Sequence, residues 1–278
     1  MTTTTNHRPP VTFADLPRLM SLMTGDAKHD QAATSTLDVL WVLYDRVLRV
    51  TPQTAGDDAR DRFVLSKGHG PMAYYAVLAA KGFLNPADLP GFGGFDSILG
   101  THPDRVLVPG VEVSSGSLGH GLPLAVGMAL GLRARGLPDA RVFVLTGDAE
   151  LDEGSNHEAI AFARAAGLDT LHVVVVDNAS STHGWPGGVE ARFAVEGWSV
   201  ARVSGRDHDA LEAAFTVPHP GRPHMVAAVV EPKYSHPAAT PTAAAAPLSA
   251  TTPLAAAEAP PAAATAAPPA AATAAPTR

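Results

Sequence analysis

Two short and almost entirely apolar runs, with a helical segment between them, constrain the fold of this chain more than any other feature. RVFVL (141–145) and LHVVVV (171–176) lack the alternation of a half-exposed strand, as expected for strands buried on both faces. Residues 152–166, between them, have helical periodicity and precede Gly167. Strands and helices alternating at this spacing predict an α/β fold, in which helices cover both faces of a parallel sheet.

The alternation continues on both sides of this unit. Further strands are expected at RFVL (62–65), WSVARV (198–203) and HMVAAVV (224–230). Further helices are expected over 36–49, from about Pro71, through PLAVGMALGL (123–132), and over 188–197 and 207–217. Ligands of parallel sheets bind at the carboxyl ends of strands, so the loops after Leu145 and Val176 are the expected place for chemistry.

Composition excludes several classes of protein. The 278 residues contain no Cys, which removes disulfide frameworks, cysteine nucleophiles and cysteine-ligated metals. The 20 Lys+Arg and 27 Asp+Glu are mixed along the chain and give a net charge of −7, which argues against a nucleic-acid-binding surface. No apolar run approaches the roughly 18 residues of a membrane span, and the N-terminus does not resemble a secretory signal. A cytoplasmic protein with no membrane contact is expected.

The terminal segments are expected to lie outside the folded domain. Residues 237–278 contain 21 Ala and 9 Pro in 42 positions, so this tail has little to bury and is expected to be disordered. It is either a plain terminus or a tether for a partner. The expected organisation is a flexible N-terminus (1–14), one α/β domain (15–236) and the tail (237–278).

Polar residues follow the two central strands where each strand ends. Asp148 comes after the first and Asn178 after the second. If the strands are neighbours, the carboxylate, the amide oxygen and a nearby backbone carbonyl form a hard oxygen set suited to Mg²⁺ or Ca²⁺, with phosphate oxygens completing the coordination. A helix starting near Asp152 would direct backbone N–H groups at such an anion. Gly-Asp and Asp-Asn are also ordinary turn formers, so the pair alone leaves both interpretations open.

Three further segments combine glycine with histidine. They are SKGHG (66–70), THP (101–103) and SGSLGHG (115–121), the last opening a helix. A glycine-rich entry to a helix lets the backbone approach a ligand closely. Taken singly, each has an ordinary explanation as a helix start, a solvated loop or a packing glycine.

Together, and in this order, these segments resemble the amino-terminal, diphosphate-binding part of transketolase, from about residue 15 to residue 233. The resemblance rests on KHDQAATSTLDVLWVLYDRVLRV (28–50), DRFVLSKGHG (61–70), PGVEVSSGSLGHGLPLAVGMALG (109–131), GDAELDEGSNHEA (147–159) and FAVEGWSVARVSGRDHDAL (193–211). It implies the thiamine diphosphate-binding fold, with the cofactor across a subunit interface and Mg²⁺ (or Ca²⁺) bridging its diphosphate to the protein.

The resemblance also implies roles for individual residues. The implied metal ligands are Asp148, Asn178 and the carbonyl of Ser180. The implied cofactor-binding residues, by backbone or side chain, are His69, Gly116, Ser117, Leu118, Gly147, Asp148, Ala149, Glu153 and Asn178. The implied catalytic residues, which hydrogen-bond hydroxyls and move protons near neutral pH, are His29, His69 and His102. Glu153 would reach across the dimer interface, although an exposed acid in the first turn of a helix explains it equally well.

The implied reaction needs a second chain. Transketolases transfer a two-carbon ketol unit from a ketose donor to an aldose acceptor, and a second α/β domain holds the pyrimidine ring and supplies a Glu. No such domain is expected after residue 236. The resemblance is therefore to the separate amino-terminal subunit of split transketolases, inactive alone, completed by a pyrimidine-binding subunit in an α2β2 assembly and acting on a small sugar or keto substrate.

The chain departs from the family pattern at several places. Asp30 and Gln31 replace Pro-Gly, and His120 stands where Gln is usual. Ala149 replaces the last residue of Gly-Asp-Gly and Ala179 a common Gly, at a cost of about 1 kcal/mol wherever the backbone needs positive φ. Past Lys233 the usual glycine-rich loop is replaced by Tyr-Ser-His-Pro and the tail, with His236 as a weak candidate substitute. Two alternatives remain: an α-type subunit of a 2-oxo acid decarboxylase or dehydrogenase, and a degenerate, non-catalytic member of the fold.

Overall fold

A parallel sheet of five strands organises the part of the chain that the computed structural model describes, residues 11–23 and 34–233. The strands are β1 (Arg62–Leu65), β2 (Val142–Gly147), β3 (Leu171–Asp177), β4 (Ser199–Ser204) and β5 (His224–Val229), in the spatial order β1-β2-β3-β5-β4. Every neighbouring pair is parallel. The predicted tail, most of the predicted N-terminal segment, His29 and His236 lie outside the described residues.

Side chains on the two faces of the sheet pack into two separate hydrophobic cores. In β2, Val142 and Val144 point into one core, while Phe143 and Leu145 point into the other. The same alternation holds in β3 and β5, and nearly all of these side chains are buried. Full burial on both faces is why these strands consist of continuous apolar runs. β4 forms an edge of the sheet and alternates between half-buried and exposed residues.

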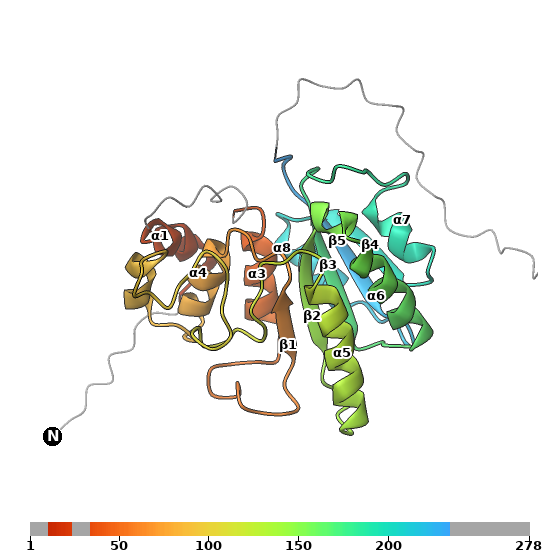
Figure 1. Ribbon diagram of the computed structural model, residues 1–278, viewed down its shortest axis with the longest axis horizontal. Helices are drawn as coiled ribbons and strands as arrows, with labels where there is room; N and C mark the ends of the chain where they lie inside the picture. Colours follow the sequence, from red (N-terminus) through yellow and green to blue (C-terminus); the bar gives the residue numbers. More distant parts are fainter. Residues whose placement is uncertain (1–10, 24–33, 234–278) are drawn as a thin grey trace, which may run out of the picture. The chain divides into compact units, whose positions relative to one another are not determined.

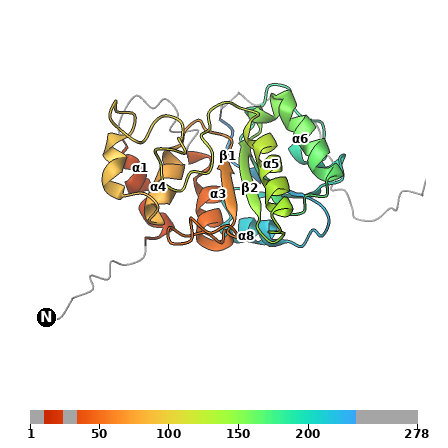
Figure 2. The ribbon, with the colours of Figure 1, turned by 60° about the horizontal axis from the view of Figure 1, so that its bottom comes forward.

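Helices cover both faces, as the sequence predicts (Figure 1). One core includes α1 (Leu16–Ser21), α3 (Leu37–Val42), α4 (Met72–Ala80) and α8 (His208–Thr216). The other includes α5 (Gly121–Ala134), α6 (Gly154–Ala165) and α7 (Val189–Ala194). Figure 2 shows α3 and α5 on opposite sides of β1 and β2. None of the described helices is long and apolar enough to cross a membrane.

Two predicted helices differ in detail. The helix expected over 36–49 is α-helical through Val42 and continues as a π-helical turn, η2 (Leu43–Val47). This wider turn places Tyr44 among Phe63, Tyr74 and Phe83, with ring centroids 5.5–6.0 Å apart. The helix expected from 152 begins at Gly154, because Glu153 is extended (φ −79, ψ 126) and a 3-10 turn, η4 (Ala149–Asp152), precedes it. Short 3-10 turns are η1 (Phe13–Asp15) and η3 (Pro86–Gly91).

A buried carboxylate holds the amino edge of the sheet together. The Asp61 side chain is fully buried and accepts hydrogen bonds from Arg49 Nη2 at 2.8 Å and Arg141 Nη2 at 2.5 Å. Burial alone would raise the pKa of Asp61, but the hydrogen bonds from Arg141 and Arg49 outweigh it and lower the pKa to about 2. Asp61 therefore fastens the start of β1 to that of β2.

Three histidines pack together at the same edge. His172 of β3, His224 of β5 and His219 of the connecting loop have ring centroids 4.8–6.2 Å apart. His224 Nε2 faces the carbonyl oxygen of Ala214 at 3.0 Å, and the Nδ1 atoms of His172 and His224 are buried without a hydrogen-bond partner. Burial, reinforced by His219, lowers the pKa of His224 to about 4 and that of His172 well below its usual value. The fold thus holds both rings neutral.

Candidate functional site

The carboxyl ends of β2 and β3 bring the three predicted metal-binding residues together. The two strands are parallel neighbours with Gly147 opposite Val176, so Asp148 and Asn178 both follow their carboxyl ends, and both are buried. The predicted ligand atom of Ser180 is its backbone carbonyl oxygen; the atom that lies between Asp148 and Asn178 is its side-chain hydroxyl, 2.8 Å from Asp148 Oδ1 and 2.6 Å from Asn178 Oδ1. The second carboxylate oxygen of Asp148 accepts hydrogen bonds from the backbone N–H groups of Ser180 (2.6 Å) and Ser181 (3.0 Å). Three side-chain oxygens therefore converge at one point of the edge.

The chemistry of this oxygen set fits a hard divalent cation. The Ser180 hydroxyl carries one proton and can donate it to only one of the two oxygens that face it. A cation would satisfy the lone pairs of both, and Mg²⁺ selects such oxygens while leaving positions to phosphate. Within residues 11–23 and 34–233, no three His, Asp or Glu side chains form a metal-binding group. The candidate set contains a single carboxylate, so a bound metal would need further anionic ligands such as a diphosphate.

The loop after β3 is fixed by a second acid, Asp152 of η4. Its carboxylate accepts hydrogen bonds from the Ser181 hydroxyl (2.8 Å) and from the N–H and hydroxyl of Thr182 (2.9 and 2.7 Å). Burial opposes the ionisation of Asp152, but these hydrogen bonds prevail and lower its pKa. The side chain of Asp152 thereby closes the loop that carries Ser180 against the end of β2.

Backbone strain falls on one of the two alanines that replace family glycines. Ala179 has φ +54° and is the one non-glycine residue of the described chain in the left-handed region. Ala149 instead lies in the 3-10 turn η4. The conformational cost expected for replacing glycine by alanine therefore applies at Ala179. It does not apply at Ala149, whose backbone is not in the left-handed region.

Glycines allow two loops to touch beside this edge. A Cβ on Gly68 would lie 2.7 Å from the backbone N of Gly116, and a Cβ on Gly121 would lie 2.2 Å from the Cβ of Ser66. Gly116 has φ +142°, and a Cβ there would meet the ring of His102 at 2.9 Å. The segments 66–70 and 115–121 therefore form one surface that only glycine permits. Side chains would fill the space in which the backbone approaches a ligand.

His69 and His102 form a pair on this surface. Their rings meet edge to face with centroids 4.6 Å apart, and His102 Nε2 lies 3.5 Å from His69 Nδ1. His69 is exposed and His102 is half-buried, so solvent or a ligand can reach both. His29, the third histidine of the predicted catalytic set, lies outside the described residues.

The remaining predicted residues surround the same loops. Ser117 is exposed and Leu118 half-buried on the turn that carries Gly116, and Gly147 ends β2 beneath the side chain of Lys67. Glu153 caps the start of α6 without a side-chain capping bond and is exposed. Its functional role and the simpler explanation as a helix-terminal acid both remain predictions.

Two charged residues at this site, the half-buried Lys67 and the buried Glu150, have no distinguishing signal in the sequence. Lys67 lies above Gly147, and burial lowers its pKa to about 8. Glu150 is 1% exposed, and burial raises its pKa. Its carboxylate accepts hydrogen bonds from the hydroxyl of Ser66 and from the N–H of Gly119. Both residues lie within motifs quoted for the resemblance, but burial of a charged side chain is a tertiary property that sequence pattern does not reveal.

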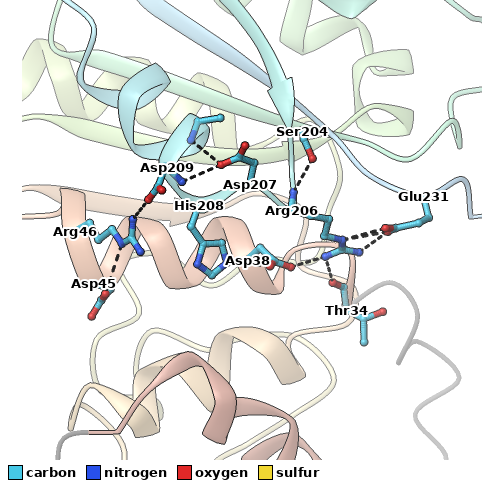
Figure 3. A network of polar contacts seen from close by, with 11 residues as sticks. Thr34, Asp38, Asp45, Arg46, Ser204, Arg206, Asp207, His208, Asp209 and Glu231 are labelled. Atoms are coloured by element: carbon cyan, nitrogen blue, oxygen red, sulfur yellow. Dashed lines mark hydrogen bonds and ion pairs between the residues drawn. The ribbon is translucent and has the colours of Figure 1, made fainter.

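An ion-pair network joins the segment before α3 to the sheet (Figure 3). Arg206, beyond β4, donates to Asp38 Oδ2 at 2.6 Å, to the carbonyl of Thr34 at 3.0 Å and to Glu231 Oε2 at 2.6 Å. His208 Nε2 lies 3.0 Å from the other oxygen of Asp38. These contacts tie the start of α3 to the carboxyl ends of β4 and β5.

Comparison with known proteins identifies the class to which this fold and site belong. The family described as "Transketolase, thiamine diphosphate binding domain" matches residues 20–252. The chain belongs to this family, which confirms both the resemblance and the fold class derived from the sequence.

Individual relatives and a solved structure are similar to the chain as follows. The chain is 35% identical over 207 residues to one subunit of the apulose-4-phosphate transketolase of Actinobacillus succinogenes, covering 72% of this chain and 75% of that protein. It is 56% identical over 218 residues to "Ferredoxin fas2" of Rhodococcoides fascians, covering 78% and 72%. The transketolase structure of Leishmania mexicana superimposes with a TM-score of 0.67 at 26% identity, over 80% of this chain and 37% of that chain. This chain thus spans little more than a third of that transketolase.

Proposed function

We propose that this chain is the amino-terminal, cofactor-binding subunit of a two-chain, thiamine diphosphate-dependent transketolase-like enzyme. The enzyme would transfer a two-carbon ketol unit from a ketose donor to an aldose acceptor. The observation that carries the proposal is the convergence of Asp148, Asn178 and Ser180 oxygens beside a glycine-only surface. The Actinobacillus relative, which is named as a transketolase subunit and aligns over three quarters of its length, supports the two-chain form.

The oxygen set would hold Mg²⁺ against the diphosphate of the cofactor. Asp148 contributes the one negative charge, while Asn178 and Ser180 contribute neutral oxygens, which leaves a net positive ion to attract a polyanion. The backbone of Gly116, Ser117 and Leu118 would line the cofactor. Thiamine diphosphate, when bound, supplies the carbanion and the electron sink that carbon–carbon cleavage requires.

The chain's own contribution to the chemistry is the placement of imidazoles. His69 and His102 present ring nitrogens that can hydrogen-bond the hydroxyls of a sugar and exchange protons with it. His69 Nδ1 and His102 Nε2 lie 3.5 Å apart, so both rings can act on the same bound substrate. We assign His29, which lies outside the described residues, to the same group.

The proposal requires a separate pyrimidine-binding subunit, which we place in an α2β2 assembly in the cytoplasm. Phosphorylated sugars, the substrate class in the name of the Actinobacillus relative, are retained there because their charge opposes passage through a bilayer. The 2-oxo acid alternative is less favoured, because it lacks support among these relatives.

Electron transfer is not part of the proposal, despite the name of the Rhodococcoides relative. Iron–sulfur clusters are held by cysteine thiolates, and the 278 residues contain no cysteine. The proposal therefore stands on the site and not on the printed name.

The test measures cofactor uptake by the complex of this chain with its co-purified partner. Thiamine diphosphate is titrated calorimetrically with and without Mg²⁺ into wild type, Asp148→Asn and a control, Asp177→Asn. Asp177 lies at the same edge, but its carboxylate pairs with Arg202 at 3.2 Å. Mg²⁺-dependent binding that is lost in Asp148→Asn and kept in the control supports the proposal. Equal binding by Asp148→Asn removes the metal assignment.

An activity assay distinguishes ketol transfer from 2-oxo acid decarboxylation. Hydroxypyruvate and pyruvate are offered to the same loaded complex with an aldose acceptor. Ketol transfer from hydroxypyruvate supports the proposal, whereas decarboxylation of pyruvate alone would assign the chain to the 2-oxo acid enzymes.

A further inference from the structure

We propose that Glu150 is a positioning residue that holds the 116–121 loop in place beside the cofactor site. The inference rests on the proposed function and adds to it a residue that is neither a predicted metal ligand nor a predicted contact of the substrate. It is carried by a buried carboxylate that joins three segments from different parts of the chain.

Glu150 connects the end of β2 to both glycine-containing loops. Its Oε1 accepts hydrogen bonds from the hydroxyl of Ser66, beyond β1, and from the N–H of Gly119 at 2.9 Å. The oxygen of Ser66 in turn accepts a hydrogen bond from the N–H of Gly121 at 3.0 Å. One side chain thereby fixes two backbone N–H groups of the loop that carries Gly116, Ser117 and Leu118.

The residue is itself held in place from α6. The side-chain amide of Asn156, which is fully buried, donates to the carbonyl oxygen of Glu150 at 2.6 Å. Glu150 is 1% exposed, and its second oxygen, Oε2, is buried without a hydrogen-bond partner. A buried polar atom without a partner costs stability, so the carboxylate of Glu150 is held here at a cost to the fold.

The loop rests closely on the residues that Glu150 binds. Gly119 has φ +82°, and its N–H points to Glu150 while its carbonyl accepts from the Ser155 hydroxyl at 2.7 Å. A Cβ on Gly121 would lie 2.2 Å from Ser66, so the loop sits directly on that serine. Removing the acceptor frees the loop to move away from the cofactor without altering Asp148 or Asn178.

The experiment compares the thiamine diphosphate Kd of the complex, in saturating Mg²⁺, across matched variants. Glu150→Leu removes the acceptor and is expected to raise the Kd about 10-fold or more. Glu150→Gln keeps an acceptor oxygen for Ser66 and Gly119 and is expected to stay within about 3-fold of wild type. Ser66→Ala breaks the same chain of hydrogen bonds with a smaller change and is used if Glu150→Leu fails to assemble.

Two controls separate positioning from general damage. Asp61→Asn loses a comparably buried carboxylate at the opposite edge of the sheet and is expected to lower the Tm while leaving the Kd unchanged. Asp148→Asn is expected to lose Mg²⁺-dependent binding altogether.

The outcomes are distinguishable. A raised Kd in Glu150→Leu or Ser66→Ala, with rescue in Glu150→Gln and none of the effect in Asp61→Asn, supports the proposal. Wild-type affinity in Glu150→Leu or in Ser66→Ala overturns it, as does equal loss in Glu150→Gln. If the wild-type complex takes up no thiamine diphosphate, the proposed function fails first and the positioning role fails with it.

Discussion

The buried histidines at the amino edge of the sheet give the fold a specific sensitivity to acid. In the unfolded chain His224 titrates near its usual pKa of 6.5, while in the folded chain its pKa is about 4. Between pH 6.5 and pH 4 the unfolded state therefore binds more protons than the folded state. The contribution of His224 to the free energy of unfolding is full above pH 6.5 and is lost as the pH falls toward 4. From this difference in pKa, the free energy of unfolding is expected to fall by about 2 kcal/mol between pH 7 and pH 5 because of this residue alone.

The variant His224→Gln removes the titration and retains an amide donor for the carbonyl of Ala214. Urea unfolding of both chains, followed by tryptophan fluorescence at pH 7, 6 and 5, gives the free energy of unfolding at each pH. The wild type is expected to lose about 2 kcal/mol more than the variant over this range. Loss of packing in the variant is a constant offset, and titrations shared by both chains cancel. Curves that stay parallel from pH 7 to pH 5 would show that His224 is not held neutral by the fold.

Three further predictions concern particular contacts. Ala179→Gly should raise the free energy of unfolding by about 1 kcal/mol, because it relieves a left-handed alanine; an unchanged urea midpoint would contradict this. Gly121→Ala should cost about 2–3 kcal/mol through overlap with Ser66, whereas Gly127→Ala, with open space around it on α5, should be neutral or stabilising. Asp61→Asn should cost about 3 kcal/mol at pH 7 by leaving two arginines without their buried partner, with the deficit shrinking as the pH falls from 3.8 through 2; a constant deficit down to pH 2 would argue against ionised Asp61.

The architecture could be predicted from the sequence because the pattern of apolar residues shows directly which strands are buried. Strands covered on both faces are mostly apolar, and RVFVL (141–145) and LHVVVV (171–176) follow that rule except at Arg141, which precedes β2, and at the buried His172. Once these strands are neighbours, parallel pairing forces Asp148 and Asn178 to one edge. Helix starts were less predictable, since the 3-10 turn before Gly154 depends on how η4 packs and not on periodicity.

The site was only partly predictable for a physical reason. Polar residues that end strands can be located by counting along the chain, but those that act through tertiary hydrogen bonds cannot. Glu150 and Lys67 have no distinguishing pattern, because only the folded chain places Glu150 against Gly119 and Lys67 against Gly147. The consequence of replacing glycine at Ala149 was likewise undecided until the backbone angles placed the strain at Ala179.

The proposed role as the metal–diphosphate half of a two-chain enzyme can be tested on the intact assembly. Native mass spectrometry of the tagged chain, purified from its own host with Mg²⁺ and thiamine diphosphate present, reports partner, cofactor and metal together. We expect a hetero-oligomer of two kinds of chain that carries the cofactor and the metal, and that loses both when Asp148 is replaced by Asn. A stable complex with its partner that remains free of cofactor and metal at saturating concentrations of both would contradict the proposed role.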